Sequence, residues 1–211
     1  MRPFRDNRPV SQVYLAMVED KKALRQRARG VLASLSEEQR TAAGSRIVQH
    51  MCSSPIFSEC TQLFAYMPVK QEVDVSLLID RALQLGKQVA LPRCRSDYSL
   101  DFHWIMQDEA DWRLLLETGP YRLLEPPTFW PRAECVQGST LILVPALAYT
   151  RSGERLGKGK GYYDRFLGEF GSHGIRLGVA FESQIVQALV LDPHDAKVDA
   201  LVTEEGLIYC V

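Results

Sequence analysis

The segment RLGKGKGYYDRF, residues 155–166, brings together side chains that phosphate chemistry uses. Three glycines alternate with two lysines, and two tyrosines and an aspartate follow: Gly157, Lys158, Gly159, Lys160, Gly161, Tyr162, Tyr163 and Asp164. Glycine allows positive φ and lets a ligand approach the backbone closely, while lysine supplies a compact positive charge. The pattern indicates a loop that binds phosphate.

The glycine pattern by itself is weak evidence. It lacks the spacing G-x-x-x-x-G-K-[ST] of a Walker loop and the spacing G-x-G-x-x-G of a dinucleotide-binding fold, so a solvated turn fits it equally well. The local charge adds weight, because residues 151–165 carry five basic and two acidic side chains in a chain whose net charge is only −1. This local excess favours a small anionic ligand and gives no reason to expect binding to nucleic acid or to a membrane surface.

The residues after the loop extend the hypothesis to a nucleotide. A helix that starts near residue 161 presents free N–H groups and the positive end of its dipole to an anion. Tyr162 and Tyr163 can stack on a flat ring or line a pocket, although core packing is the alternative that we expect for at least one of them. Asp164 can bind the Mg²⁺ that accompanies ATP phosphates.

Two βαβ units are expected to position these residues. We expect a strand, a helix and a strand at residues 62–68, 74–86 and 87–92, and again at residues 140–145, 161–170 and 175–181. Such units form a parallel sheet flanked by helices, with ligands at the carboxyl ends of the strands. The predicted fold class is α/β: a single domain with a mixed, mostly parallel central sheet, Rossmann-like and similar to sugar isomerases and CoA transferases.

Further elements extend this core. Residues 99–105 alternate as an added strand would, and residues 200–209 suggest a terminal hairpin. Two helices precede the first strand, at residues 19–33 and 36–51, and Ser36 with Gln39 predicts a capping box at the start of the second.

The N-terminus lacks this periodicity. We expect residues 1–16 to form a poorly ordered arm and residues 17–211 to form the domain. The alternative is that Met17 is the natural start and the arm is an extension.

Composition predicts a cytoplasmic protein. Five cysteines form an odd set without a C-x-x-C pair, which predicts reduced thiols and no structural zinc site. The N-terminal residues lack the apolar segment of a signal peptide, and no apolar run approaches the ~20 residues of a membrane span. We expect a monomer.

Four segments, in order along residues 21–204, resemble the 5-formyltetrahydrofolate cyclo-ligase family, also called 5,10-methenyltetrahydrofolate synthetases. KKALR resembles its K-x-x-L-R motif, YMPVKQEVD its Y-x-P-x-x-x-E-[VI]-[DE] motif, VPALAYTRSGERLGKGKGYYDRFL its R-L-G-x-G-x-G-Y-Y-D motif, and HDAKVDALVTE its C-terminal segment. The resemblance implies ATP- and Mg²⁺-dependent closure of 5-formyltetrahydrofolate to 5,10-methenyltetrahydrofolate, with release of ADP and phosphate. An N-formyl (imidate) phosphate is the implied intermediate.

The resemblance also implies roles for individual residues. Lys158, Lys160 and Arg155 would be catalytic at the transferred phosphoryl group. ATP would contact Lys21, Arg25 and the whole loop: Arg155, Leu156, Gly157, Lys158, Gly159, Lys160, Gly161, Tyr162 and Tyr163. The folate substrate would contact Met67, Glu72, Tyr121 and Tyr162, with Glu72 on the N–H donors of the pterin, and Asp164 and Asp195 would hold Mg²⁺.

Each of these residues has a simpler alternative. Lys21 and Arg25 fit a solvated helix face, Glu72 and Asp74 fit helix caps, and Asp195 fits an ordinary loop acid. No role is assigned to the four histidines. Two positions depart from the family pattern: Ala146 stands where glycine is usual, and Arg122 stands where a small residue is usual.

Two other functions compete with the cyclo-ligase. One is a phosphate-handling relative of sugar-phosphate isomerases, which would not need ATP. The other is a non-catalytic protein that binds a nucleotide or an RNA end. The carboxylates Glu72, Asp164 and Asp195 argue against the second, because a pure anion binder gains nothing from acids beside its lysines.

Overall fold

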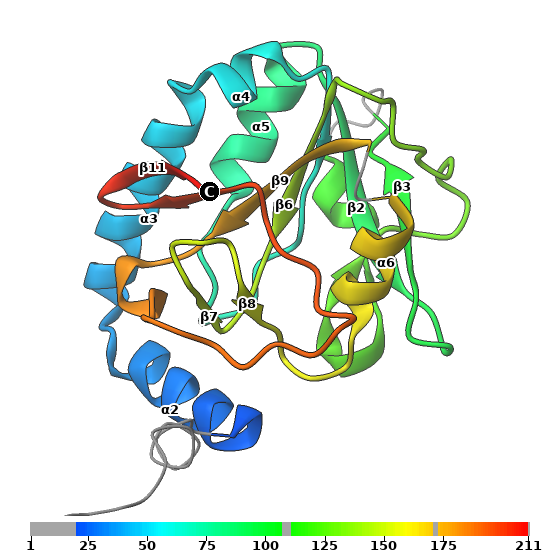
Figure 1. The fold of residues 1–211 in the computed structure, drawn as a ribbon. Coiled ribbons are helices and arrows are strands. Elements are labelled where there is room, and N and C mark those ends of the chain that lie inside the picture. Colours follow the sequence, from blue (N-terminus) through cyan, green and yellow to red (C-terminus); the bar gives the residue numbers. More distant parts are fainter. Residues whose placement is uncertain (1–19, 107–110, 171–172, 211) are drawn as a thin grey trace, which may run out of the picture.

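A seven-stranded sheet forms the centre of the protein (Figure 1). The computed structural model describes residues 20–106, 111–170 and 173–210, so the predicted arm at residues 1–16 lies outside the described residues. The strands run in the order β11-β10-β9-β6-β1-β2-β3. Their bounds are β1 Gln62–Phe64, β2 Gln88–Cys94, β3 Leu100–Trp104, β6 Thr140–Val144, β9 Gly174–Val179, β10 Ala200–Thr203 and β11 Gly206–Tyr209.

The sheet is mostly parallel, as predicted. The five central strands pair in parallel, while β3 and β11 add antiparallel edges. The predicted βαβ units are both present: α5 (Ser76–Gln84) connects β1 to β2, and α6 (Tyr162–Phe170) lies between β6 and β9. Because the chain leaves β1 toward β2 and later returns to β6 on the other side, the β1–β6 boundary is a topological switch point, where α/β proteins bind ligands.

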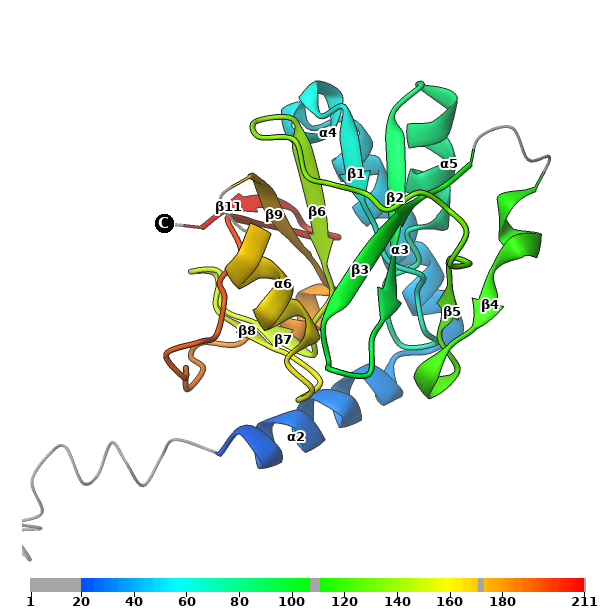
Figure 2. The same cartoon turned by 90° about the vertical axis from the view of Figure 1, so that its right-hand side faces the viewer.

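Each face of the sheet buries its own core. Successive side chains alternate between faces, so in β6 Leu141 joins one apolar cluster and Ile142 the other. Helices α3 (Glu37–Cys52), α4 (Pro55–Glu59) and α5 cover the first face, and α6 covers the second (Figure 2). The first cluster includes Ile47 and Met51 from α3.

Helix α2 (Lys21–Ser34) runs past the end of the sheet at which β6 finishes (Figure 2). The side chain of Asp20 caps it, and α3 begins with the predicted capping box of Ser36 and Gln39. α2 packs mainly against η3, a 3₁₀ turn at Glu182–Gln184, and buries Leu24 with Leu156. Its polar face is thereby brought to the carboxyl ends of the parallel strands.

Several predicted elements are longer than the elements in the structure. The strand expected at residues 62–68 ends at Phe64, and the helix expected at residues 74–86 begins at Ser76 without a side-chain cap. Asp74 instead accepts a hydrogen bond from the Ser76 amide at 2.9 Å. The Ala65 amide still donates to the Ala90 carbonyl of β2 at 2.9 Å, and the next two residues, Tyr66 and Met67, line a cavity at the end of the strand, which the apolar sequence does not indicate.

Two small hairpins were not predicted. β4 (Glu117–Thr118) pairs with β5 (Leu124–Glu125), and β7 (Ala148–Tyr149) pairs with β8 (Arg155–Leu156). Two 3₁₀ turns, η1 (Trp112–Leu115) and η2 (Pro120–Arg122), accompany the first hairpin. Strands of two residues are too short to show a period in sequence.

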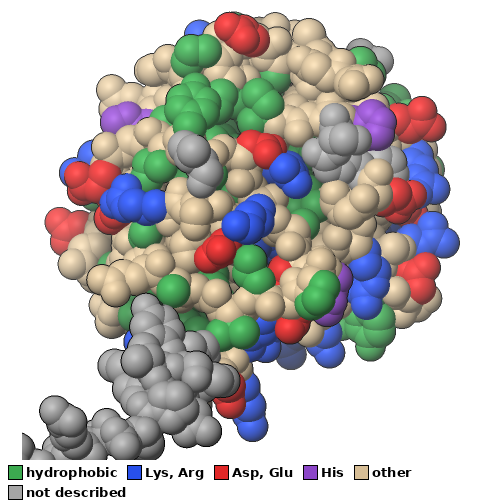
Figure 3. Space-filling model, viewed as in Figure 1, with side chains coloured by type: hydrophobic (Ala, Val, Ile, Leu, Met, Phe, Trp, Pro, Cys, Tyr) green, Lys and Arg blue, Asp and Glu red, His purple; other side chains and the backbone are tan. Residues whose placement is uncertain are grey.

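The surface carries mixed charge. On the face in Figure 3, basic and acidic side chains are interspersed, in keeping with the net charge of −1. The five cysteines are free thiols. Among the described helices, none combines the length and apolar character that a membrane span requires.

The aromatic contact between β1 and α6 gives a test of the fold. Phe64 is buried, with its ring 4.9 Å from that of Phe102 and 6.3 Å from that of Phe166 on α6. Phe64→Ala should lower the free energy of unfolding by about 3–5 kcal/mol, because it opens a cavity under α6. Leu77→Ala, at a position in α5 that is 67% exposed, should change it by less than about 0.5 kcal/mol. Denaturant unfolding measures both, and equal losses would contradict this packing.

Candidate functional site

The glycine loop follows the β7–β8 hairpin and leads directly into α6. Gly159 (φ 101°) and Gly161 (φ 72°) have the positive φ that the alternating glycines predict. Gly157 lies outside that region, and its carbonyl accepts a hydrogen bond from Arg25 Nε at 3.0 Å. Arg25 therefore holds the loop from α2 and packs beneath Gly159, where an added Cβ would lie 3.3 Å from the guanidinium carbon.

The loop borders a cavity of about 150 Å³ at the β1–β6 switch point. Its lining comes from the residues after β1 and β6, from β2 and the start of β3, from the β4–β5 hairpin, and from β8 and the glycine loop with the first turn of α6. Among the predicted site residues, those that line it are Met67, Glu72, Arg155, Gly157, Lys158, Lys160, Gly161, Tyr162, Tyr163 and Asp164. The structure thus brings most of the predicted residues into one place.

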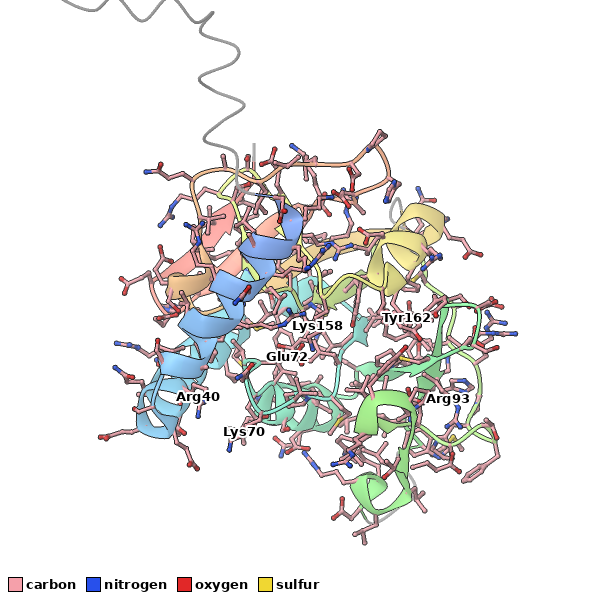
Figure 4. The ribbon with its side chains drawn as sticks, turned by 90° about the horizontal axis from the view of Figure 1, so that it is seen from below. Arg40, Lys70, Glu72, Arg93, Lys158 and Tyr162 are labelled. Atoms are coloured by element: carbon pink, nitrogen blue, oxygen red, sulfur yellow. The ribbon has the colours of Figure 1, made fainter. Side chains whose placement is uncertain are left out.

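Lys158 and Glu72 form an ion pair across this cavity. The lysine Nζ lies 2.6 Å from Glu72 Oε1, and the two side chains meet beside α2 (Figure 4). The other carboxylate oxygen of Glu72 accepts a hydrogen bond from the Val69 amide at 3.1 Å. Lys158 is about half exposed, so its ammonium can exchange this partner for a ligand oxygen.

Lys160 is an exposed residue of the loop that also lines the cavity. Its ammonium stands 5.8 Å from the centre of the Tyr98 ring, and its carbonyl accepts a hydrogen bond from Arg165 at 3.0 Å. Arg165 also lies over the Tyr98 ring. Lys160 thus has a cation–π contact and, among the residues that the structure describes, no carboxylate partner, which leaves its charge available to an anion.

Arg155 points into the protein and not toward solvent. Its guanidinium is buried, donates to Asp164 in a close ion pair, and donates through Nε to the Ala196 carbonyl at 3.0 Å. The next residue, Leu156, is also buried, but it packs against Leu24 of α2. Leu156 can therefore reach a nucleotide only through its backbone.

Lys21 connects α2 to the loop before β10. Its ammonium lies 2.5 Å from Asp195 and 2.6 Å from Asp192. Burial alone would lower the pKa of Lys21, but the hydrogen bonds to both aspartates outweigh it and raise that pKa. Burial would raise the pKa of Asp195, and the bond from Lys21 reverses this and lowers it. Both groups are therefore held in their charged forms.

Tyrosines form one wall of the cavity. The ring of Tyr162 stands 5.8 Å from that of Tyr98 and 6.5 Å from that of Tyr121, both edge-on. Figure 4 shows Tyr162 on the same side of the molecule as Arg93. Tyr162 and Tyr163 also pack on the second core cluster, so each combines core packing with lining. Tyr121 is exposed and contributes through its contact with Tyr162.

The two departures from the family pattern have different consequences. Ala146 is buried without positive φ, and its carbonyl accepts a hydrogen bond from Gln184 at 2.8 Å, so glycine is not required there. Arg122 has φ 58°, in the region that favours glycine, and it follows Tyr121 at φ 60°. The turn of the β4–β5 hairpin is therefore strained.

Eight of the lining residues had no role predicted from sequence, and the acid among them is Glu125. It lies in β5, is almost fully buried, and accepts a hydrogen bond from the Cys94 amide at 3.1 Å. The only signal in sequence is a carboxylate between apolar residues and prolines, in LLEPP, which does not show where the side chain points.

Comparison with known proteins identifies the family. The model described as the 5-formyltetrahydrofolate cyclo-ligase family matches residues 17–204. The chain belongs to this family. The resemblance inferred from four segments is confirmed.

Relatives match most of this cyclo-ligase family member. A protein of Mycolicibacterium smegmatis named 5-formyltetrahydrofolate cyclo-ligase is 35% identical over 148 residues, covering 68% of this chain and 74% of the relative. A Caenorhabditis elegans protein named probable 5-formyltetrahydrofolate cyclo-ligase is 27% identical over 201 residues, covering 92% and 98%. The NMR structure of Aquifex aeolicus 5,10-methenyltetrahydrofolate synthetase has a TM-score of 0.77 and 30% identity, covering 90% of this chain and 92% of that one.

The acids of this cyclo-ligase family member fit a hard cation such as Mg²⁺, which prefers oxygen ligands. Asp164 accepts a hydrogen bond from the Ala196 amide at 3.3 Å, which places it next to the residue that follows Asp195. Basic groups already neutralise both carboxylates, Arg155 at Asp164 and Lys21 at Asp195. His194, given no role from sequence, clusters with Asp192 and Asp195, their ligand atoms within 4.8 Å of one another.

The loop conformation gives a test at Gly159. Gly159→Ala should destabilise the protein by about 1 kcal/mol or more, because an L side chain is strained at φ 101° and would press on Arg25. Gly168→Ala in α6 is the matched control, since nothing lies within 4 Å of its added Cβ, and it should be neutral or stabilising. Thermal denaturation compares them. A neutral Gly159→Ala would contradict the loop geometry.

Proposed function

We propose that this protein catalyses the ATP- and Mg²⁺-dependent cyclisation of 5-formyltetrahydrofolate to 5,10-methenyltetrahydrofolate, releasing ADP and phosphate. The observation that carries the proposal is the family match over residues 17–204, which includes the glycine loop with its two lysines at the cavity. The alternating loop, the aromatic wall and the paired acids supply the three parts that the reaction needs: phosphate binding, a ring-binding surface and oxygen ligands for a cation.

The chemistry activates a poor leaving group. The formyl oxygen attacks the γ-phosphorus of ATP, the bond to ADP breaks, and an N-formyl (imidate) phosphate forms. N10 then bonds to the formyl carbon, the carbon–oxygen bond breaks, and phosphate leaves with its electron pair as N10 loses its proton. The protein contributes mainly positioning and neutralisation of charge on the transferred phosphoryl group.

Lys158 and Lys160 bind the transferred phosphoryl group in this proposal. The ion pair between Lys158 and Glu72 supports it, since a phosphate oxygen that replaces Glu72 on the ammonium leaves the carboxylate free for the substrate. The residue that binds the transferred phosphoryl group and the residue that contacts the substrate then lie next to each other. Met67, Tyr121 and Tyr162 complete the folate side, where Met67 lines the cavity and the two rings contact each other.

The remaining loop and α2 bind ATP. Arg25 fixes the loop backbone at Gly157, and Lys21 stands at the acids near the α6 end of the loop. Arg155 orients Asp164 from within, so its part in catalysis is to hold that carboxylate and the loop. Asp164 and Asp195 would hold Mg²⁺, which when bound neutralises phosphate charge.

A direct assay tests the proposal. Protein, ATP, MgCl₂ and 5-formyltetrahydrofolate are mixed, and the near-ultraviolet absorbance of the methenyl product is followed while ADP is measured in parallel. Product and ADP should rise in equal amounts. Folded protein that forms neither would exclude this function.

The two loop lysines give a sharper prediction. Lys158→Ala and Lys160→Ala should each lower turnover ~10²-fold or more, because they stabilise charge in the transition state more than in the ground state. Thermal stability should change little, since neither ammonium is buried. Lys70→Ala, on the segment that also carries Glu72 (Figure 4), is the control and should retain activity. Unchanged turnover in both loop variants would show that the loop is only a structural turn and does not act in catalysis.

Substitution of the site's acids should affect the Mg²⁺ requirement and the KM for folate separately. Asp164→Asn and Asp195→Asn should each raise the Mg²⁺ concentration for half-maximal activity, and the double variant should be less than additive because one ion is shared. Glu72→Gln should instead raise the KM for folate and leave the Mg²⁺ requirement unchanged. Separate titrations of Mg²⁺ and folate measure both.

Asp80→Asn is the control for the metal prediction. Asp80 lies on α5, pairs with Arg113 and does not line the cavity, so the Mg²⁺ requirement should stay at the wild-type value. If Glu72→Gln changes the Mg²⁺ requirement while Asp164→Asn changes only the KM for folate, the assignment of Asp164 to the metal and of Glu72 to the folate is wrong.

A further inference from the structure

One buried carboxylate in the cavity has no use in the proposed reaction. Glu125 is 1% exposed, and its Oε1 accepts the Cys94 amide at 3.1 Å. Its Oε2 is fully buried and has no hydrogen-bond partner in the described part of the chain. A buried carboxylate oxygen without a donor is costly, so its retention in a ligand cavity calls for a donor from the ligand.

The basic groups nearby bind other acids. Lys158 pairs with Glu72, and Arg155 pairs with Asp164. Arg93, on the same strand as Cys94, donates to Glu117 at 2.9 Å and to the Pro126 carbonyl at 2.6 Å. In the described part of the chain, each of these three cations is therefore paired with another acid, and none is paired with Glu125.

The hairpin turn makes room for this carboxylate. A Cβ added at Gly119 would lie 2.2 Å from both Cδ and Oε2 of Glu125. The φ of Gly119 is −88°, so close approach and not backbone conformation requires glycine there. The carboxylate is thus held against the backbone of its own hairpin, with its free oxygen within the cavity wall.

One neighbour defines what the Glu125 end of the cavity can bind. Burial, and then a hydrogen bond with the Glu125 carboxylate, raises the pKa of the Cys94 thiol to about 12, so the thiol stays neutral. Tyr163 lines the cavity nearer to Glu72: burial, followed by the charge of Glu72, raises its pKa, and its buried hydroxyl lacks a hydrogen-bond partner among the described residues. The Glu125 end of the cavity therefore offers a carboxylate acceptor between apolar walls that include Pro92, Leu100 and Leu123.

We propose that Glu125 recognises the substrate ring, accepting hydrogen bonds from the N–H donors of its 2-amino-4-oxopyrimidine edge. The inference rests on the proposed function and deepens it. A planar edge that carries a ring N–H beside an amino group can give both donors to one carboxylate, and a flat ring fits the apolar walls. In this arrangement Glu125, and not Glu72 as the family resemblance implied, accepts these N–H donors. Glu72, paired with Lys158, then faces the part of the substrate that carries the formyl group.

The test compares two ligands and two proteins. Binding of 5-formyltetrahydrofolate, and of the same molecule with its 2-amino group replaced by hydrogen, is measured by calorimetry without ATP. Wild-type protein should bind the desamino molecule about 10-fold or more weakly, because Glu125 loses a donor. Glu125→Gln should bind the parent more weakly, and its preference for the parent should shrink to less than about 3-fold.

Glu117→Gln is the matched control. Glu117 lies opposite Glu125 in the β4–β5 pairing but is half exposed, and this variant should keep the wild-type preference. If Glu125→Gln does not fold, Glu125→Asp replaces it, since a shorter carboxylate should also lose much of the preference. A purely structural Glu125 would change stability and leave the preference intact.

The outcomes separate this inference from the proposed function. Wild-type protein that cyclises the parent but binds both ligands equally overturns the role of Glu125 alone. A full preference retained in a folded Glu125 variant overturns it as well. Wild-type protein that neither binds nor cyclises the parent overturns the proposed function, and this inference with it.

Discussion

The buried ion pair between Arg155 and Asp164 is the contact on which the rest of the site depends. Through it and the bond to the Ala196 carbonyl, one guanidinium joins β8, the first turn of α6 and the segment before β10. Removal of one member of a buried pair costs about 3–5 kcal/mol, because it leaves an uncompensated charge. Both ends of the glycine loop are therefore held in place before any ligand binds. The glycines between them affect only the backbone conformation of the loop itself.

Several other charged side chains of the site form ion pairs in the free protein, and a ligand can replace one partner of each pair. Lys158 holds Glu72, and Lys21 holds Asp192 and Asp195, so each of these five side chains has a partner of opposite charge in the free protein. A nucleotide phosphate and its bound cation supply a negative and a positive charge together. The phosphate can pair with the lysines, and the cation can bind the carboxylates. Because each separated group gains a new partner, the exchange avoids leaving a charge unpaired, which is the costly outcome in a site of low polarity.

The sequence predicted the framework well because the framework is repetitive. Apolar runs, capping signals and glycines located both βαβ units, the capping box at Ser36 and the positive φ of Gly159 and Gly161. It could not predict where Arg155 points. A basic residue beside a glycine loop suggests a phosphate ligand, but the two-residue strand β8 turns Arg155 toward Asp164 and Leu156 toward α2, and a strand that short shows no alternation.

Glu125 was beyond sequence reasoning for a related reason. Its surroundings come from β2, from the β4–β5 hairpin and from α6, which are far apart in the chain, and its neighbours in sequence only suggest a proline-rich loop. Even the resemblance to the family, which located the loop and the acids, gave this residue no role.

The strain in the hairpin turn is best understood together with this carboxylate. Tyr121 and Arg122 both have positive φ, which costs each non-glycine residue about 1 kcal/mol or more. The same turn begins at Gly119, which packs on Glu125, and it carries the Tyr121 ring to Tyr162. A turn with another backbone conformation would change both placements at once, because the five residues between Thr118 and Leu124 carry both Gly119 and Tyr121. The strained backbone thus couples an aromatic contact at the rim of the cavity to a buried acceptor within it, and the ring of a ligand that contacts both would be fixed in position and in orientation.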